Sequence, residues 1–165
     1  MTGTPTGDAE LAIAVVILAP RAMPSDRDVV AAMVESAREL AAYVAVVVPK
    51  GWRAPPRSRV VHVAPGVSAI GAIRAGMAQL SNTPARYALL WPLAGGPADV
   101  ARVRALVSGV ARERPALAAL EGDDPEHAPL MIARDAWLDL MTLGEQGIAA
   151  VAARHGMHRV AAGAT

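Results

Sequence analysis

The densest group of residues that could do chemistry is an acidic segment in the second half of the sequence. Residues Glu121 to His127 place four carboxylates and one imidazole within seven residues. Oxygen-rich loops of this kind can bind Mg²⁺ or Ca²⁺. The spacing matches neither an EF-hand loop nor a zinc motif, and a charged connection between strands is usually just solvated. Both interpretations of residues 121–127 stay open at this point, and the solvated loop is favoured.

Two arginines, Arg21 and Arg27, lie close behind the first long apolar run. Guanidinium groups bind phosphate and carboxylate oxygens, so the pair could hold an anionic ligand; the alternative is two solvated arginines beside a helix start. The segment Ala19 to Ser25 cannot wrap a phosphate closely, because it contains two prolines and no glycine. The nucleotide-binding patterns G-x-G-x-x-G and G-x-x-x-x-G-K-[ST] are absent from the chain.

A third candidate follows the fourth predicted strand, in the segment Pro92 to Pro97. Its glycines, Gly95 and Gly96, permit unusual backbone angles or the close approach of a ligand. Metal-dependent phosphoryl chemistry needs a carboxylate near a strand end, and Asp99 is the candidate within reach. Capping of the next helix is the favoured role for Asp99.

Composition narrows the classes of function. The chain has 165 residues, of which 53% are hydrophobic and 19% charged, and its net charge is +1. We therefore expect one folded domain over residues 11–165 after a flexible tail over residues 1–10, and no general binding of nucleic acid. Absence of cysteine excludes disulfides and thiolate metal sites, and His155 with His158 is interpreted as a surface pair rather than a metal site. The longest apolar run, Leu11 to Ala19, is too short to span a membrane, and with no targeting segment we expect a cytoplasmic protein.

Short apolar runs alternate with segments of helical spacing, which predicts a parallel α/β arrangement. The predicted strands are Ile13–Leu18, Val44–Val48, Val60–Val63, Tyr87–Trp91, Leu117–Glu121, Leu130–Ala133 and Arg159–Ala161. The predicted helices begin with one after Ser25, where Ser25 and Asp28 form a capping box, and continue with Ser68–Leu80, Ala98–Arg112, Ala136–Leu143 and Gly147–Arg154. In such sheets ligands bind beyond the carboxyl ends of the strands.

Four segments, in this order, resemble the MobA-like nucleotidyltransferases, a family that includes the molybdenum-cofactor guanylyl- and cytidylyltransferases. They are Gly66–Gly76, similar to G-x-x-x-S-[LI]-x-x-G; Leu89–Pro97, similar to a strand followed by P-V-D-x-P; His127–Arg134, similar to G-H-P-V-L-x-x-R; and Leu143–Ile148, similar to L-x-G-D-x-G-[AI]. The resemblance covers about 150 residues. It implies a three-layer, Rossmann-like fold of the nucleotide-diphospho-sugar transferase type, with a mostly parallel sheet flanked by helices. It further implies nucleotide-binding roles for Ser68, Gly95 and Gly96, and Glu145 where the family has aspartate.

The catalytic motifs of the family are missing from this chain. Members open with a long L-A-A-G-x-S-x-R-M-G loop and a downstream lysine, whereas here Ile17 to Arg21 leads almost directly into a helix and no lysine precedes Lys50. The family's metal-binding aspartate falls at about Ala94, which cannot ligate Mg²⁺. The resemblance therefore predicts a pseudoenzyme, a binding or assembly module with a protein partner, a second copy of itself, or a nucleotide or small anion as its ligand.

The alternative is an active Mg²⁺-dependent nucleotidyltransferase of the molybdenum-cofactor or sugar-phosphate type. Its rearranged catalytic and metal-binding residues would be Asp99 and Glu145, with Arg21 and Arg27 on the nucleotide. The identity of the nucleotide and of the acceptor stays open. Trp52 and Trp91, if exposed at one surface, would indicate association with a partner.

Overall fold

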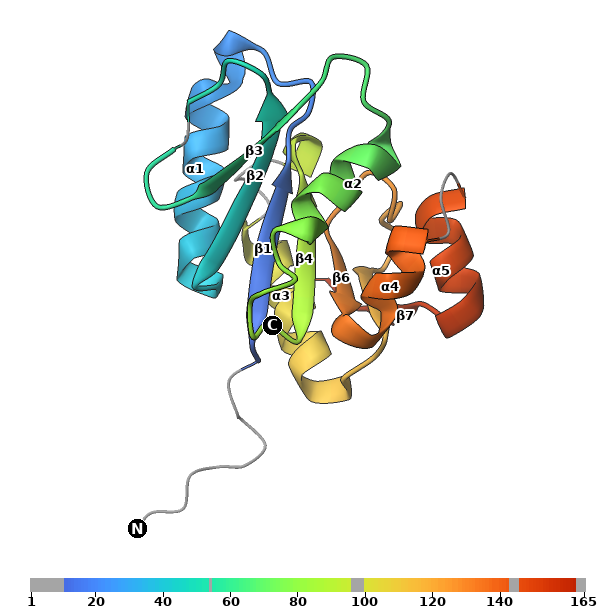
Figure 1. The fold of residues 1–165 in the computed structure, drawn as a ribbon. Coiled ribbons are helices and arrows are strands. Elements are labelled where there is room, and N and C mark those ends of the chain that lie inside the picture. Colours follow the sequence, from blue (N-terminus) through green and yellow to red (C-terminus); the bar gives the residue numbers. More distant parts are fainter. Residues whose placement is uncertain (1–10, 54, 96–99, 143–145, 163–165) are drawn as a thin grey trace.

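The computed structural model describes residues 11–53, 55–95, 100–142 and 146–162. These residues build a seven-stranded sheet of order β3-β2-β1-β4-β6-β5-β7, flanked by helices (Figure 1). The strands are β1 (Ile13–Leu18), β2 (Tyr43–Pro49), β3 (Arg59–Val63), β4 (Tyr87–Pro92), β5 (Leu117–Leu120), β6 (Leu130–Ala133) and β7 (His158–Val160). The predicted flexible tail, residues 1–10, lies outside the described residues.

Strand β1 occupies the middle of the parallel half of the sheet, between β2 and β4. Strand β6 reverses direction, because it pairs antiparallel with both β4 and β5, while β7 is parallel to β5. Six of the seven strands therefore run the same way, and their carboxyl ends meet at one edge, which we call the carboxyl edge. The opposite edge, where these strands begin, is the amino edge.

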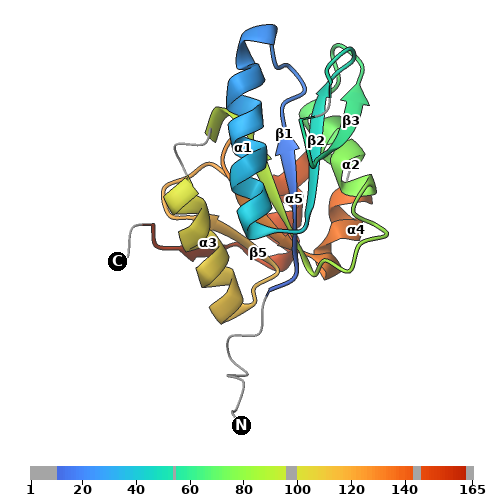
Figure 2. The same ribbon diagram turned by 90° about the vertical axis from the view of Figure 1, so that its left-hand side faces the viewer.

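The sheet is covered on both faces, as continuous apolar strands require. Helices α1 (Arg27–Leu40) and α3 (Val100–Glu113) pack on one face, and α2 (Ala69–Ala78), α4 (Arg134–Thr142) and α5 (Gly147–His155) on the other (Figure 2). Successive residues of β1 serve the two layers in turn, since Val15 and Ile17 belong to the α1/α3 core and Ala14 and Val16 to the α2/α4/α5 core. The predicted fold class, a three-layer α/β sheet that is mostly parallel, is confirmed. No helix of the described residues is long and apolar enough to cross a bilayer.

The start of α1 differs from the prediction. A short 3₁₀ turn, Pro24–Asp26, leads into the helix, and the Asp26 carboxylate accepts a hydrogen bond of 2.8 Å from the Met23 N–H. The predicted capping box of Ser25 and Asp28 is wrong. The box is formed by Met23 and Asp26 instead, because Asp26 lies three residues after the Met23 N–H. Asp26 is also the N-cap residue of α1, but its carboxylate is bonded within the turn and makes no capping hydrogen bond to the helix.

Helix α2 follows the prediction closely. Ser68 is its N-cap, and the Ser68 Oγ accepts a hydrogen bond of 3.0 Å from the Gly71 N–H. Gly76 lets the helix approach the sheet, since a Cβ at that position would lie 2.4 Å from Cγ1 of Val16 and 3.0 Å from Cγ2 of Val47. Because α2 follows β3, which runs parallel to β2, the start of the helix lies at the carboxyl edge.

One arginine fastens the antiparallel strand to the rest of the sheet. The Arg134 guanidinium donates hydrogen bonds of 2.8 Å to the carbonyl oxygens of Ser81, Thr83 and Ala85. The same group lies over the ring of Trp137, 4.7 Å from its centroid. The start of α4 is thereby tied to the turn that precedes β4.

Candidate functional site

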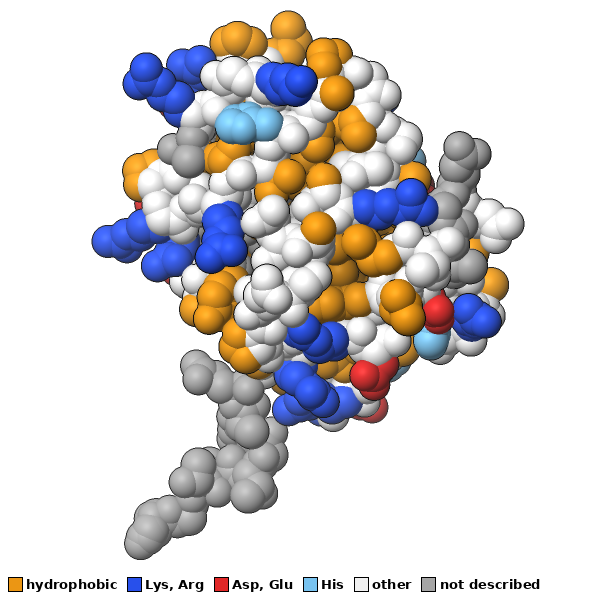
Figure 3. Space-filling model, in the orientation of Figure 1, with side chains coloured by type: hydrophobic (Ala, Val, Ile, Leu, Met, Phe, Trp, Pro, Cys, Tyr) orange, Lys and Arg blue, Asp and Glu red, His pale blue; other side chains and the backbone are white. Residues whose placement is uncertain are grey.

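The carboxyl edge carries the segments that the sequence marked as candidate sites. It is the upper edge in Figure 1, where Figure 3 shows Lys and Arg side chains among apolar ones. The connection from β1 to α1 is short and internally bonded. Its Ala19 N–H donates to the Val47 carbonyl (2.8 Å), its Ala22 N–H to the Ala19 carbonyl (3.2 Å), and its Met23 N–H to Asp26. These backbone donors face the protein, so they are not directed at a ligand.

The cationic part of this edge lies above β1, β2 and β3. Arg21 and Arg27 are both exposed. The Arg27 guanidinium carbon lies 5.9 Å from the centroid of the half-buried Trp52 ring. The positive charge of Arg27 therefore lies over an aromatic face. The Trp52 carbonyl is 2.7 Å from Nε2 of His62, so the β2–β3 connection is fixed to β3. Trp52 was predicted only as a possible partner contact and His62 was not predicted as a site residue, because nothing in their spacing resembles a motif.

A pocket of about 260 Å³ opens between the starts of α2 and α5. It is lined by Ser68, Ala69, Ile70, Ile73, Glu126, Gln146, Gly147 and Ile148. The fold thus brings together three separate segments that the sequence had singled out: the start of α2, the acidic loop and the turn before α5. Among the described lining residues Glu126 carries the only charge, so this pocket suits a polar, uncharged group better than a phosphate.

Two carboxylates of the acidic loop, residues 121–127, are paired with neighbouring side chains. Oδ1 of Asp123 lies 2.6 Å from Nη2 of Arg102, and the Asp123 carbonyl accepts a hydrogen bond of 2.7 Å from Arg159. Asp124 pairs with Nδ1 of His127 at 2.9 Å; this bond, and then the backbone N–H of Glu126, lower the pKa of the Asp124 carboxyl. In the part of the chain that the structure describes, no group of three or more acidic or histidine side chains could hold a metal ion. The solvated-loop interpretation of residues 121–127 is thus favoured over the metal site.

Several predicted site residues lie outside the described residues: Gly96, Asp99 and Glu145. Their predicted roles in binding nucleotide or metal stay predictions. Gly95 is the last residue of a 3₁₀ turn, Leu93–Gly95, that follows β4. Ala94 lies in the same turn and is exposed, and its methyl group offers no ligand to a cation.

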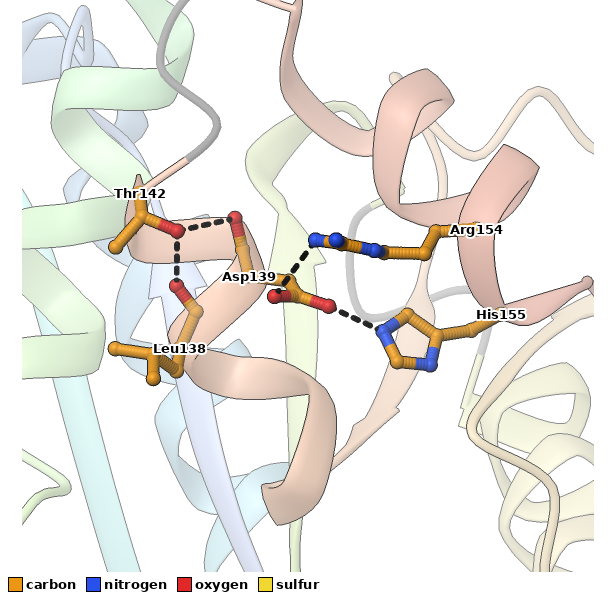
Figure 4. Close-up of polar contacts among 5 residues, drawn as sticks. All are labelled: Leu138, Asp139, Thr142, Arg154 and His155. Atoms are coloured by element: carbon orange, nitrogen blue, oxygen red, sulfur yellow. Dashed lines mark hydrogen bonds and ion pairs between the residues drawn. The ribbon is translucent and has the colours of Figure 1, made fainter.

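The two histidines near the end of the chain are separated by the structure. His155 faces α4, where its Nε2 lies 2.5 Å from Oδ2 of Asp139, and Nη1 of Arg154 lies 3.2 Å from Oδ1 of the same carboxylate (Figure 4). His158 is on β7, after the turn at Gly156. The cluster around Asp139 joins α4 to α5. Trp91 is fully buried, so it contributes nothing to a surface for association.

Comparisons with known proteins identify the fold. No protein-family model and no curated protein matches the chain. Among solved structures, Rv0371c from Mycobacterium tuberculosis H37Rv aligns with a TM-score of 0.65 at 20% identity, over 93% of this chain and 88% of that one. The chain has a nucleotide-diphospho-sugar transferase-like fold.

Two further structures of this fold are named for their activities. The 2-C-methyl-D-erythritol 4-phosphate cytidylyltransferase from Thermus thermophilus aligns with a TM-score of 0.62 at 15% identity, over 93% of this chain and 90% of that one. Glucosyl-3-phosphoglycerate synthase from Mycobacterium tuberculosis, solved with Mn²⁺, UDP-glucose and phosphoglyceric acid, aligns with a TM-score of 0.62 at 14% identity, over 94% of this chain and 71% of that one. At these identities the likeness concerns the fold, and sites on one fold differ widely in chemistry.

Proposed function

We propose that this protein is a MobA-like pseudoenzyme that binds a nucleoside phosphate at the carboxyl edge without transferring the nucleotidyl group. The observation that carries the proposal is the connection from β1 to α1. It is short, it contains Pro20 and Pro24, and the N–H groups of Ala19, Ala22 and Met23 are bonded within the protein. A loop built this way cannot surround a triphosphate with backbone donors.

The electrostatic argument leads to the same function. Nucleotidyl transfer depends on positioned charges that stabilise the developing negative charge on the phosphoryl oxygens. Ala94 stands where the resemblance places the metal-binding aspartate, and no lysine lies between residues 1 and 49. Arg21 in the connection and Arg27 at the start of α1 are the cations that directly follow β1, and they can bind phosphate oxygens without activating them.

The bound nucleotide is expected to use two parts of the edge. Its phosphates pair with Arg21 and Arg27, where the positive charge is exposed to solvent. Its base or sugar is expected near Trp52, the aromatic ring at this edge that Arg27 already contacts. The pocket beside Ser68 and Gln146 then accommodates a polar, uncharged portion of the ligand.

A protein partner or a second copy of the chain remains part of the proposal. Met23 lies in the connection from β1 to α1 with 63% of its surface exposed, and Val29 on the adjacent turn of α1 is 36% exposed. An apolar side chain at the mouth of a shortened loop favours contact with another protein surface. Such a partner would complete the edge where the loop is short.

The first test is thermal denaturation of the protein with GTP, CTP, ATP and UTP, each with and without Mg²⁺. A ligand at a hundredfold excess over its Kd adds about 2.7 kcal/mol of stability, which raises the Tm of a chain of this size by about 5 to 11 °C. The double variant R21Q/R27Q should lose the shift. R112Q is the matched control, because Arg112 is exposed at the far end of α3.

The second test separates binding from catalysis. Pyrophosphate release from each nucleoside triphosphate is measured with Mg²⁺ and a sugar-phosphate or pterin acceptor. The proposal expects a Tm shift without pyrophosphate release. Release that depends on Mg²⁺, and that is lost in D99A or E145A, would contradict it and support the active nucleotidyltransferase. Absence of any Tm shift with all four nucleotides would contradict the nucleotide as the ligand.

A further inference from the structure

A second pocket lies at the amino edge of the sheet, at the opposite ends of the strands from the candidate functional site. Its volume is about 280 Å³. The walls come from the starts of β2 and β3 and from the segment that follows α2: Ala42, Tyr43, Val44, Ala45, Arg57, Ser58, Arg59, Gln79, Leu80 and Thr83. We call it the amino-edge pocket. Its size is near the lower limit for sites that bind small molecules.

The amino-edge pocket is positively charged. Arg57 and Arg59 both line it, and its described lining residues include no Asp or Glu. Neither arginine side chain has a hydrogen bond or an ion pair among the residues that the structure describes. In Figure 3, Lys and Arg side chains gather on the β2–β3 side of the molecule. Two guanidinium groups of this kind beside a concave surface attract an anion.

The backbone at Arg57 supports a role for its side chain. Its φ of 65° lies in the left-handed region, which is unfavourable for a residue other than glycine. Arg38 holds this strained backbone in place. Its Nη1 donates to the Arg57 carbonyl at 3.4 Å and to the Ala42 carbonyl at 3.2 Å. Glycine would adopt this conformation without cost, so the fold alone gives no reason for an arginine here.

The remaining walls divide into donors and an apolar floor. The hydroxyl groups of Ser58 and Thr83 already donate to the carbonyls of Pro55 and Leu80, each at 2.7 Å, so they have no proton to offer a ligand. The Gln79 amide and the hydroxyl of Tyr43, which is 40% exposed, are the uncharged donors that line the pocket. The floor is apolar, from Ala45 and Leu80.

We propose that the amino-edge pocket is a second binding site, which takes a small organic anion. The anionic group, a phosphate monoester or a carboxylate, pairs with Arg57 and Arg59. An apolar body about the size of one ring lies on the floor formed by Ala45 and Leu80, with Tyr43 and Gln79 at the rim. This site is independent of the proposed nucleotide site, because the two lie at opposite edges of the sheet.

The test is isothermal titration of the protein with phenyl phosphate, benzoate, inorganic phosphate and benzyl alcohol. Phenyl phosphate or benzoate should bind saturably, and the stronger of the two identifies the anion. Inorganic phosphate should bind more weakly because it lacks the apolar body, and uncharged benzyl alcohol should not bind. Saturable binding of benzyl alcohol with the affinity of the anions, or no saturable binding of either organic anion at millimolar concentration, would overturn the proposal.

Variants locate the site and separate it from a purely structural role. R57G and R59Q should each weaken binding about tenfold or more, because each removes a charge-assisted hydrogen bond. R57G should at the same time keep or raise the Tm, since glycine relieves the left-handed backbone. The matched control is R112Q, which should bind the organic anion unchanged, because Arg112 is exposed at the end of α3 and lines neither pocket. Unchanged affinity in R57G and R59Q, or an equal loss in R112Q, would refute this assignment.

Discussion

The contact between α2 and the centre of the sheet can be tested with a single methyl group. Gly76→Ala would place a Cβ 2.4 Å from Cγ1 of Val16, whereas carbon atoms in favourable contact are about 3.5 to 4.0 Å apart. Relief of this overlap requires a displacement of roughly 1 Å. Val16 cannot easily yield, since it is fully buried, β-branched and paired with Ala45 on one side and Leu90 on the other.

The expected change in the free energy of unfolding of G76A is the sum of two opposing terms. Replacing glycine with alanine inside a helix gains about 1 kcal/mol from helix propensity. Overpacking a rigid core costs about 1 to 3 kcal/mol, and the stiff neighbours of Gly76 favour the upper part of that range. We therefore expect G76A to lower the free energy of unfolding by about 1 to 2 kcal/mol. Ala78 is exposed and is the last residue of the same helix, so A78G gives a lower limit for the propensity term without the packing term.

The assay is urea denaturation of the wild type, G76A, V16A and V16A/G76A. Truncation of Val16 removes the methyl group that the added Cβ would strike, so the double variant should be more stable than the sum of the single effects by about 1 kcal/mol or more. A G76A protein as stable as the wild type, or a double variant with strictly additive effects, would refute the argument that α2 is held at the limit of close packing.

Three further predictions concern the other contacts. Gly109→Ala should cost no more than about 1 kcal/mol in urea denaturation, although its Cβ would lie 2.6 Å from Val160, because Val160 belongs to a three-residue edge strand that can shift; a loss larger than that of G76A would contradict this. Arg134→Lys should cost about 2 to 4 kcal/mol in the same assay, because an ammonium cannot reach all three carbonyls; unchanged stability would contradict it. Burial raises the pKa of Tyr87 above 10.0, so its neutral form stabilises the fold below pH 10.0 and this contribution is lost as the pH rises through the native pKa. Tyr87→Phe should therefore make the Tm less sensitive to alkaline pH, and an unchanged alkaline profile would count against that assignment.

The strands could be predicted well because burial on both faces leaves a simple signal in the sequence. The predicted bounds of β1 and β6 match the structure, and β5 ends one residue before the prediction. The reversed direction of β6 had no local signal, since it depends on the pairing of Tyr87 with Ala133 in another part of the chain. The capping box was wrong because a 3₁₀ turn supplied Asp26 instead.

The site was only partly predictable, for a different reason. Motif resemblance singled out Ser68 and the turn before α5, and the fold brings these segments to one pocket. Trp52 was predicted as a possible partner contact but not as a ligand-binding residue, because it lies in a proline-rich connection that carries no motif. Arg57 and the amino-edge pocket were missed because ligand sites were expected only beyond the carboxyl ends of the strands. A pocket made from the starts of two strands and the end of a helix has no signature in sequence spacing.

The pairing of β4 with β6 also bears on how the chain folds while it is being made. Strands β1 to β4 are complete once Pro92 has been synthesised, but the outer edge of β4 has no partner until Leu130 to Ala133 follow. At about 5 to 20 residues per second this interval lasts a few seconds. During that time the edge of an apolar strand is open to other chains, which is a recognised route to aggregation. We expect the ribosome-bound chain to depend most on chaperones in this interval, and that dependence should end when β6 docks.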